Sequence, residues 1–445
     1  MSFDRASMSP AIAGAHGFRV NNAGHLEIGG VDALALARDF GTPLHVLDEE
    51  RLRANCREYR DTLAEAYGPN ARAIFASKAC CTIATCQIAH QEGLGIDVAS
   101  GGELHTALRA GVPARDLYFH GNNKTLDEVE YGLRTGVGRC VVDNEHEFDL
   151  LETVTARLDT TADILLRLTP GIEPHTHQAI RTGGVDSKFG FGMLDGAAYR
   201  AVVRASRMPR VRLRGLHAHI GSQVCDLEPF RMSAAALVDF AARIRDELDV
   251  TVEELNLGGG LGIRYVPADE PPRIADFVRA LAGVVTARLG AHRLSHPRLF
   301  LEPGRSIVGS AGVTLYTVGA VKSIPGVRTY VSVDGGMFEN PRPALYGAQY
   351  EAVAAARAAD AATDTVAVAG RCCESGDVLI WEARLPPVRS GDLLAVFGTG
   401  AYTYSMASNY NRFPRPAVVL AGHGRGRCVV ERETYDDLLR KDVSL

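Results

Sequence analysis

The segment Arg72-Ala-Ile-Phe-Ala-Ser-Lys-Ala79 predicts a short buried strand with one lysine at its carboxyl end. Residues 73–76 are all apolar, and Lys78 follows directly after them. In α/β folds the carboxyl ends of parallel strands face the site that is used for chemistry. A lysine that is partly desolvated there loses proton affinity and can act as a nucleophile. A solvated lysine that merely closes a strand is the alternative, and Lys78 alone does not separate the two.

The chain around this segment alternates between strand-like and helix-like stretches. Patterns of helical spacing, such as residues 126–135 and 230–248, separate short apolar runs. The runs end near Lys78, Val98, His120, Val142, Leu168, His219, Gly258 and Glu302. About eight strand–helix units over roughly 240 residues match a (β/α)8 barrel in count and length. A doubly wound open sheet is the alternative, because alternation alone does not close a barrel.

The alternation ends after Arg305, where the chain changes to strand-like runs separated by Gly and Pro turns. This pattern predicts an all-β second domain. A short hairpin pattern near the N-terminus, around residues 16–28, has no place in the barrel repeat. We therefore expect an N-terminal β hairpin over residues 1–40 that joins the β domain, a barrel over 41–307 and a C-terminal β domain over 308–445.

The composition indicates a large packed core and excludes several classes of protein. The chain has 445 residues, of which 46% are hydrophobic and 23% charged, and its net charge is −5 at pH 7. No basic surface for nucleic acid is therefore expected. No apolar run reaches the ~18 residues of a membrane span, and the N-terminus lacks a signal pattern, so we expect a cytoplasmic protein. Its nine cysteines are expected to be mostly free thiols.

Polar and glycine-rich motifs follow several predicted barrel strands, and each has a structural as well as a functional interpretation. The glycines 258–260 leave backbone N–H groups open to an anion, or they form a tight turn. Glu302 and Arg305 suit recognition of phosphate or carboxylate, or form an ordinary ion pair. His217 and His219 are predicted on one face of a strand. They are candidates for metal binding, for stacking on a planar cofactor, or for a place in the core.

The predicted β domain carries three further polar loops. In Gly370-Arg-Cys-Cys-Glu-Ser-Gly-Asp377 a thiol stands beside a carboxylate, which indicates acid–base chemistry. The loops 340–346 and 399–402 contain Arg342, Tyr346 and Tyr402, which suit a carboxylate and a phosphate. A structural role remains open for each of these loops.

Taken together, these motifs carry a resemblance to a known family. They are Phe75-Ala-Ser-Lys-Ala79, His120-Gly-Asn-Asn-Lys124, Ser187-Lys-Phe-Gly190, His217-Ala-His-Ile-Gly-Ser222, Gly258-Gly-Gly260, Glu302-Pro-Gly-Arg305, Asn340-Pro-Arg-Pro-Ala-Leu-Tyr-Gly347 and Cys373-Glu-Ser-Gly-Asp377. With them the chain resembles the diaminopimelate decarboxylases over nearly its whole length. These are fold-type III enzymes that use pyridoxal 5'-phosphate. The resemblance implies a barrel of the alanine racemase type, an all-β domain, and a homodimer with active sites at the subunit interface.

The resemblance also implies roles for the residues that match the family's motifs. Lys78 would form a Schiff base with the cofactor, and His219 would stack on its ring. Glu302 would face the pyridine nitrogen, and Asp97 would also contact the cofactor. Its phosphate end would be held by Ser222, Gly258, Gly259, Gly260, Gly304, Arg305 and Tyr402. No metal is expected.

The substrate would be bound by residues of both subunits. The resemblance places Arg305, Arg342, Tyr346 and Tyr402 at the substrate, with the arginines and Tyr346 at its far carboxylate. From the partner subunit, Cys373 would act as the proton donor and Glu374 would meet the distal ammonium.

The reaction implied by the resemblance is decarboxylation of meso-2,6-diaminopimelate to L-lysine and CO2, the last step of lysine biosynthesis. Alanine racemases of this fold present an arginine where this chain has Glu302, which favours a decarboxylase. Two arginines favour a substrate with a second carboxylate over ornithine, since an unpaired buried guanidinium is costly. A carrier-bound amino acid is a weaker alternative. A pyridoxal-phosphate-binding homeostasis protein should lack the β domain, and a metal-dependent hydrolase would use His217 and His219 as ligands.

Overall fold

The chain divides into two compact units, and each is described by itself. The computed structural model describes residues 8–172, 184 and 186–445. The barrel unit comprises Arg53–Gly262 and Pro271–Ile307, and the β-rich unit comprises Met1–Leu52, Ile263–Glu270 and Val308–Leu445. Residues 1–7 of the N-terminal segment expected from the sequence lie outside the described residues.

Eight parallel strands form the barrel unit and close on themselves. They are β5 (Ala71–Ala76), β6 (Gly95–Val98), β7 (Leu117–Phe119), β8 (Arg139–Val142), β9 (Ala162–Thr169), β11 (Val211–Ala218), β12 (Glu254–Asn256) and β13 (Arg298–Leu301). β13 pairs with β5, and β8 pairs with β9, so the sheet has no free edge between these strands. The two-residue strand β10 (Phe191–Gly192) adds to β9. The barrel predicted from the sequence is therefore confirmed, and the open sheet is wrong.

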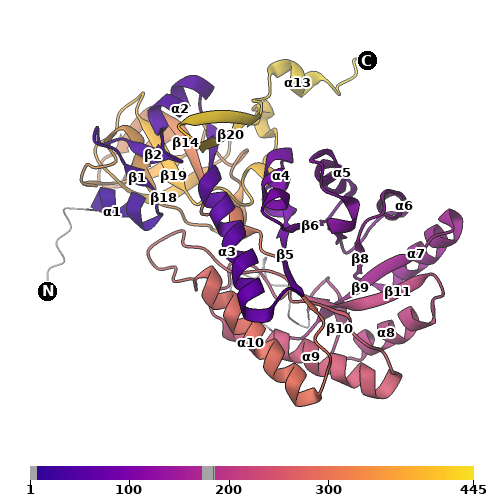
Figure 1. Cartoon of the computed structure of the whole chain (residues 1–445). Coiled ribbons are helices and arrows are strands. Elements are labelled where there is room, and N and C mark those ends of the chain that lie inside the picture. Colours follow the sequence, from indigo (N-terminus) through magenta and orange to yellow (C-terminus); the bar gives the residue numbers. More distant parts are fainter. Residues whose placement is uncertain (1–7, 173–183, 185) are drawn as a thin grey trace. The chain divides into compact units, whose positions relative to one another are not determined.

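Helices follow the strands and lie outside the ring of strands in Figure 1. They are α3 (Glu49–Tyr67), α4 (Ile83–Gln91), α5 (Gly101–Arg109), α6 (Leu126–Thr135), α7 (Glu145–Leu158), α8 (Ala197–Arg207), α9 (Glu228–Leu248), α10 (Ile274–His292) and the short α11 (Arg305–Val308). α6 shows how the sequence sets such a helix. Thr125 and Glu128 form a capping box at its start, and Gly136 ends it with a φ of 78°.

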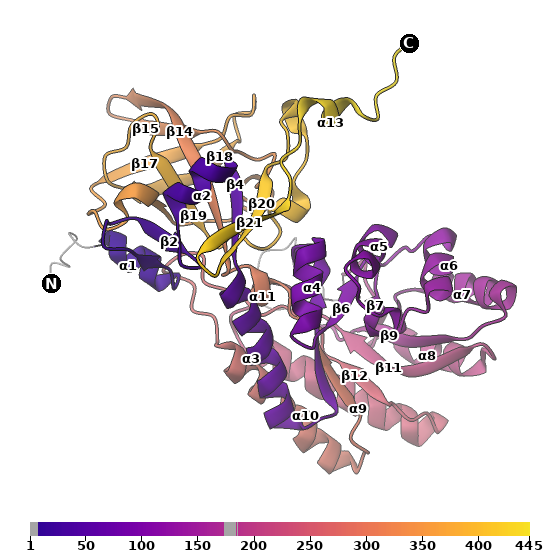
Figure 2. The same ribbon diagram turned by 45° about the horizontal axis from the view of Figure 1, so that its top comes forward.

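The β-rich unit is built on a mixed sheet with the strand order β18-β17-β15-β14-β4-β20-β21. Its strands are β4 (Leu44–Asp48), β14 (Gly312–Ile324), β15 (Arg328–Val333), β17 (Asp364–Ala369), β18 (Val378–Leu385), β20 (Ala417–Gly422) and β21 (Arg425–Val430). β19 (Leu393–Phe397) pairs with both β14 and β16 (Ala352–Ala354). Figure 2 labels most of these strands together with the short helix α13 (Tyr435–Leu439), and the unit also contains the short helix α12 (Arg342–Tyr346). The β-rich character expected for the C-terminal part is confirmed.

The N-terminal segment contains the expected hairpin and two helices that the sequence did not indicate. β1 (Arg19–Val20) pairs antiparallel with β2 (Leu26–Ile28), and β3 (Val31–Asp32) completes a separate small sheet. The helices are α1 (Met8–Ala15) and α2 (Ala33–Phe40). β4 pairs with β14 and β20, so the compact units place residues 41–52 with the β-rich unit. The domain boundaries near residues 40 and 307 therefore stay a prediction.

Each unit has its own apolar core. In the barrel, Ile74, Tyr118, Val141, Leu165 and Phe300 form one buried cluster that joins five strands. In the β-rich unit, one cluster packs around Val313, Leu315 and Phe397, and another packs around Tyr316, Val331 and Val368. Burying a side chain of this size stabilises the folded state by about 1.5–3 kcal/mol. Among the helices of the described residues, none combines the length and the apolar character needed to cross a bilayer.

Candidate active site

The carboxylate of Glu302 lies at the centre of a buried polar cluster at the carboxyl ends of the barrel strands. His120 Nε2 is 2.8 Å from Glu302 Oε1, and Asn256 Nδ2 donates to the same oxygen at 2.6 Å. His217 Nε2 is 3.0 Å from Glu302 Oε2. Each partner stands at the end of a different strand, and all four residues are buried. Closure of the barrel therefore brings three polar side chains together around the carboxylate of Glu302.

The charges in this cluster are set by burial and by the two carboxylates. Burial raises the pKa of Glu302, but the imidazoles of His120 and His217 outweigh this effect and hold the pKa well below its usual range. Burial alone would lower the pKa of His120, yet Asp97 and Glu302 raise it overall. For His217 burial dominates and lowers the pKa to about 4. Near neutral pH the cluster therefore contains an ionised Glu302 and a neutral His217.

Asp97 and Lys78 stand on neighbouring strands beside this cluster. Asp97 lies in β6, where it is in register with Ala76 of β5, and Lys78 is an exposed residue just past the end of β5. Burial raises the pKa of Asp97 to about 6, while His120 and the positive charge of Lys78 act in the opposite direction. His120 Nε2 is 3.8 Å from Asp97 Oδ1. The lysine and the two carboxylates thus belong to one electrostatic site.

His219 is held by the glycine turn that follows β12. The Gly259 N–H donates to His219 Nδ1 at 3.3 Å, so that this nitrogen carries no proton. Burial lowers the pKa of His219 well below its usual value, and the nearby charges of Lys78 and Arg167 lower it further. A Cβ at position 259 would lie 2.0 Å from the carbonyl oxygen of Glu302, so only glycine fits there. The glycine motif is therefore required by packing, and the N–H groups of Gly258 and Gly259 donate to Asn256 Oδ1 and His219 Nδ1.

Arg305 and Ser222 lie together at the same end of the barrel. Arg305 Nε and Nη2 donate to Ser222 Oγ at 3.2 and 3.0 Å, and the arginine is buried. Gly304 is packed closely, since a Cβ there would lie 3.0 Å from Cβ of Ala76. The barrel unit thus brings together all of the site residues predicted within it. They are Lys78, Asp97, His219, Ser222, Gly258, Gly259, Gly260, Glu302, Gly304 and Arg305.

The remaining predicted residues belong to the β-rich unit, where Arg342 has an unusual environment. Its side chain is buried, and Nη1 donates to the hydroxyl of Tyr350 at 2.5 Å. Its Nε has no hydrogen-bond acceptor, and no carboxylate lies within 4.0 Å of the guanidinium among the described residues. Tyr346 ends the same short helix, α12. A buried cation without an anion is costly, so Arg342 is suited to an anion supplied by a ligand.

Cys373 and Glu374 project from a loop whose base is fixed by Asp377. The Asp377 carboxylate accepts from the N–H of Met337 at 2.7 Å and from the N–H of Cys372 at 2.8 Å. The side chains of Cys373 and Glu374 are exposed, whereas Asp377 is buried. The base of the loop is therefore fixed by hydrogen bonds, while its Cys373 thiol and Glu374 carboxylate point outward.

Tyr402 is distinguished by its backbone. Its φ of 58° lies in the left-handed region, which non-glycine residues adopt rarely and often at functional sites.

The structure also identifies buried polar residues to which the sequence patterns assign no role. His120 and Asn256 hold Glu302, and the signal was present because each follows or ends a predicted strand. Lys124 is buried and donates to the carbonyl oxygens of Gly121 and Val141 and to Glu147 Oε2, all within 2.9 Å. No sequence pattern indicated the buried partner of that lysine.

The metal interpretation of the histidine pair is not favoured by the geometry. The sequence indicates His217 and His219 as candidate metal ligands, but His219 Nδ1 accepts from the Gly259 N–H. His120, His217 and Glu302 do place three possible ligand atoms within 4.8 Å of one another. Both histidine nitrogens are at hydrogen-bond distance from a Glu302 oxygen, so hydrogen bonding accounts for the cluster.

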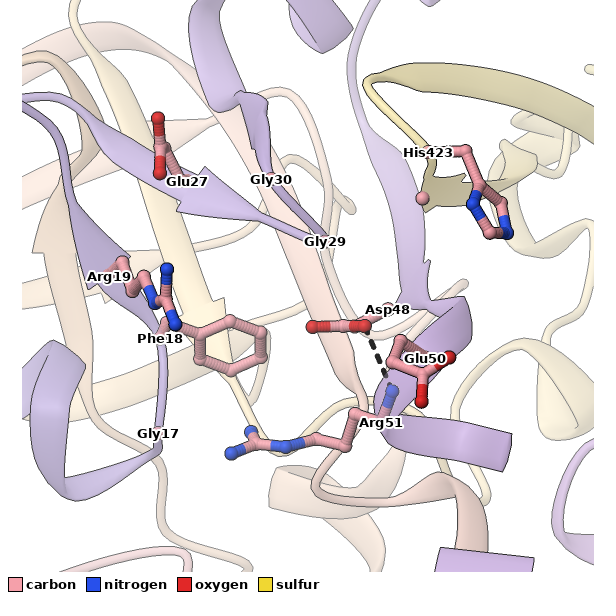
Figure 3. A pocket seen from close by; sticks show the side chains of 11 residues that line it. Gly17, Phe18, Arg19, Glu27, Gly29, Gly30, Asp48, Glu50, Arg51 and His423 are labelled. Atoms are coloured by element: carbon pink, nitrogen blue, oxygen red, sulfur yellow. Dashed lines mark hydrogen bonds between the residues drawn. The ribbon is translucent and has the colours of Figure 1, made fainter. Parts of the chain in front are cut away.

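A separate cavity of about 390 Å³ lies in the β-rich unit (Figure 3). Arg51 lines it and donates through Nη1 to the carbonyl oxygens of His16 and Ser310, at 2.5 and 3.0 Å. The Arg51 N–H donates to Asp48 Oδ1 at 3.0 Å, the dashed line in Figure 3. None of the predicted site residues lines this cavity.

Comparison with known proteins connects the chain to one group of enzymes. Residues 49–309 match the family described as "Pyridoxal-dependent decarboxylase, pyridoxal binding domain". The chain is 49% identical over 425 residues to the diaminopimelate decarboxylase of Bacillus subtilis (strain 168), covering 96% of this chain and 97% of that protein. It is 42% identical to the enzyme of the same name from Mycobacterium tuberculosis (strain H37Rv), covering 94% of each chain.

Solved structures show the same similarity. The crystal structure of diaminopimelate decarboxylase from M. jannaschii in co-complex with L-lysine superposes with a TM-score of 0.88 at 35% identity, covering 96% of this chain and 98% of that one. The Helicobacter pylori enzyme complexed with L-lysine gives a TM-score of 0.84 at 27% identity, covering 92% of this chain and 98% of that one. With its barrel, its β-rich unit and these relatives over nearly its full length, the chain belongs to the diaminopimelate decarboxylase family of pyridoxal-dependent decarboxylases.

Proposed function

We propose that the protein decarboxylates meso-2,6-diaminopimelate to L-lysine and CO2, the last step of lysine biosynthesis. Membership of the family supports the reaction type, and the buried guanidinium of Arg342 supports the substrate. Arg342 is only 5% exposed, and none of the described carboxylates lies within 4.0 Å of it. Meso-diaminopimelate has an amino acid at each end. One carboxylate can therefore leave as CO2 while the other pairs with an arginine.

The substrates of related decarboxylases would leave this cation unpaired. Ornithine and lysine carry a side-chain ammonium and no second carboxylate. Desolvating a guanidinium without an anion costs several kcal/mol, so a site built for these substrates would gain nothing from a buried arginine. Arg342 is therefore the residue that favours a dicarboxylic amino acid. Arg305 and Tyr346 are proposed to act at the same end of the substrate.

The residues of the barrel fit pyridoxal phosphate. An exposed amine, Lys78, stands at a strand end beside a buried and ionised carboxylate, Glu302. The turn at Gly259 has no room for a side chain, and Arg305 lies beside the Ser222 hydroxyl. When bound, the cofactor supplies an electron-poor ring that takes up the electron pair left by departing CO2.

The chain's own groups prepare this chemistry. Lys78 would hold the cofactor covalently through Nζ and be displaced by the substrate's amino group. Glu302 would keep a negative charge beside the ring nitrogen, since its pKa is held low by His120 and His217. His219, which is neutral, would lie against the ring face. The phosphate would be held by Ser222, Gly258, Gly259, Gly260, Gly304, Arg305 and Tyr402, with Asp97 near the ring.

Protonation of the substrate carbon is proposed to need a second subunit. Cys373 and Glu374 are exposed on their loop. We propose that they enter the active site of the partner in a homodimer, where the Cys373 thiol returns a proton to Cα and Glu374 meets the distal ammonium. A cytoplasmic location remains part of this proposal.

Lysine at position 78 provides the direct test of the reaction. Borohydride reduction of the purified protein should attach pyridoxal phosphate to the peptide that contains Lys78, as seen by mass spectrometry. Lys78→Ala should lose this adduct and the release of CO2, whereas Lys322→Ala, an exposed lysine of β14, should keep both. Meso-diaminopimelate, ornithine, lysine and arginine should be assayed side by side. Turnover of ornithine but not of diaminopimelate would refute the substrate, and full activity of Lys78→Ala would refute the mechanism.

Mixed dimers test the shared site. Lys78→Ala and Cys373→Ala should each be inactive as homodimers. A mixture refolded together should regain activity, because one of the two sites then has both residues intact. Cys428→Ala, which also removes an exposed thiol, should remain active by itself. Failure of the mixture to recover activity would contradict a site built from two subunits.

A further inference from the structure

We propose that Tyr265 and Tyr350 are specificity-determining positioning residues that hold the Arg342 guanidinium ready for the distal carboxylate of the substrate. The proposal rests on the proposed function, because it assumes that Arg342 meets a substrate carboxylate. All three residues belong to the β-rich unit. We call them the arginine clamp.

Tyr350 fixes one nitrogen of the guanidinium. Its hydroxyl accepts from Arg342 Nη1 at 2.5 Å and donates to Asn340 Oδ1 at 3.4 Å. Burial raises the pKa of Tyr350 to about 12, although Arg342 opposes this, so the phenol stays protonated near neutral pH. The hydroxyl therefore orients the arginine without adding a negative charge.

The ring of Tyr265 packs with its face against the Arg342 guanidinium. Arg342 Cζ lies 4.7 Å from the centroid of the Tyr265 ring and 5.6 Å from that of Tyr350. The two rings pack edge to face at 5.6 Å with an angle of 87° between their planes. A cation over an aromatic face is attracted by the negative face of the ring, and this attraction is stronger when the cation is desolvated. The arginine clamp thus contacts the Arg342 guanidinium through the hydrogen bond to Tyr350 and the ring faces of both tyrosines.

Tyr265 is itself held firmly, although it comes from a segment between two barrel elements. Residues Ile263–Glu270 follow β12 and belong to the β-rich unit. The N–H groups of Tyr265 and Val266 donate to Asp269 Oδ2 at 2.9 and 3.0 Å, which fixes the turn. A Cβ on Gly398 would lie 3.0 Å from the Tyr265 ring, so the ring is packed on that side. The segment therefore places an aromatic face under Arg342.

The neutrality of the clamp gives it a role in specificity. An aspartate or glutamate beside Arg342 would orient it equally well, but it would also cancel its charge and compete with the substrate. Two tyrosines orient the guanidinium and leave its charge uncompensated. The Nε–H of Arg342 is also buried, and it has no hydrogen-bond acceptor among the described residues. A ligand carboxylate therefore gains a strong interaction, and a ligand that lacks the carboxylate leaves the buried cation unpaired.

The test compares two amino acids that differ at the distal end. 2-Aminopimelate has a carboxylate there, and 2-aminohexanoate has only hydrogen; both are measured as competitive inhibitors of diaminopimelate decarboxylation by the holoenzyme. Tyr350→Phe should raise the inhibition constant of 2-aminopimelate and the KM for meso-diaminopimelate about tenfold or more, the typical effect of a hydrogen bond to a charged group. The inhibition constant of 2-aminohexanoate and kcat should stay within about threefold of wild type.

Matched variants separate the two parts of the clamp. Tyr265→Leu should also weaken the binding of 2-aminopimelate selectively, and Tyr265→Phe, which keeps the ring face, should weaken it less than Tyr265→Leu does. Tyr330→Phe, a tyrosine of β15, should leave both constants unchanged. If Tyr265→Leu fails to fold, Tyr350→Phe decides the question alone.

The outcomes distinguish the clamp from the proposed function. An equal loss of affinity for both inhibitors, or no loss for 2-aminopimelate in Tyr350→Phe, would overturn the clamp while leaving the proposed reaction intact. A wild-type enzyme that binds the two inhibitors equally well would refute the role of Arg342 in substrate choice, and the clamp with it.

Discussion

Replacing Glu302 by glutamine removes the charge at the centre of the barrel site while keeping the size of the side chain. The carboxylate has room for about four acceptor contacts, and His120, Asn256 and His217 already use three of them. In Glu302→Gln the amide oxygen can still accept at one side. The amide NH2 must then face another N–H donor, such as that of His217 at 3.0 Å. Charge-assisted bonds become neutral ones or are lost.

The magnitude follows from the lost charge. A hydrogen bond to a charged group contributes about 1.5–3 kcal/mol, against about 1 kcal/mol for a neutral one. The difference of about 0.5–2 kcal/mol, felt by the cofactor's ring nitrogen in the transition state, should lower kcat of Glu302→Gln by about 2- to 30-fold. Because Glu302 is one of the two carboxylates that raise the pKa of His120, that pKa should fall in the variant.

The assay is CO2 release at saturating meso-diaminopimelate and saturating pyridoxal phosphate. Glu302→Asp keeps the charge and should retain more activity than Glu302→Gln. Glu152→Gln removes an exposed carboxylate of α7 and serves as the matched control. Thermal melts establish that each variant is folded, and the titration of the His120 imidazole can be followed by NMR. A Glu302→Gln enzyme with bound cofactor and a kcat within twofold of wild type would refute the role of this charge.

Three further variants probe the buried polar groups. Glu147→Gln should lower the free energy of unfolding, measured in urea, by about 3–5 kcal/mol, because the ammonium of Lys124 then stays buried without its anion. A Lys124→Met/Glu147→Leu double variant that is even less stable than Glu147→Gln would contradict this explanation. Tyr316→Phe removes the hydroxyl that donates to the fully buried Glu339 at 2.5 Å, and it should lower the free energy of unfolding, measured in urea, by about 1–3 kcal/mol. An unchanged urea midpoint of unfolding would show that the carboxylate finds another donor. Burial lowers the pKa of His217 to about 4, so the folded protein loses stability as the pH falls from about 6.5 towards 4. In thermal melts, His217→Gln should remove about 2 kcal/mol of the stability that the wild type loses between pH 7.5 and 5. Parallel curves of stability against pH for wild type and variant would argue against this.

The sequence was sufficient for the barrel and for the residues at its strand ends. A lysine, an acid or a histidine after an apolar run can be located by local periodicity alone. The carboxyl ends of parallel strands meet at one end of a barrel, so Lys78 and Glu302 were predicted to share a site. The sequence also indicated the family, because the motifs that identify it are spread over nearly the whole chain.

The contacts of the histidines needed the tertiary structure. His217 and His219 were expected on one face of a strand, but β11 ends at Ala218. His219 therefore leaves the alternation and meets the Gly259 N–H, while His217 faces Glu302. His120 is 182 residues from Glu302 in the chain, and only closure of the barrel makes them neighbours.

Local patterns thus determined which elements form and which polar residues stand at their ends, because hydrophobic periodicity and turn residues act over a few positions. The partners of those residues were decided only by the folded chain. Arg342 shows the difference: its motif was visible in the sequence, but Tyr265 and Tyr350, and the absence of a carboxylate within 4.0 Å among the described residues, became visible only in three dimensions. Electrostatics and cation–π contacts depend on distance in space and on burial, and neither is encoded in spacing along the sequence.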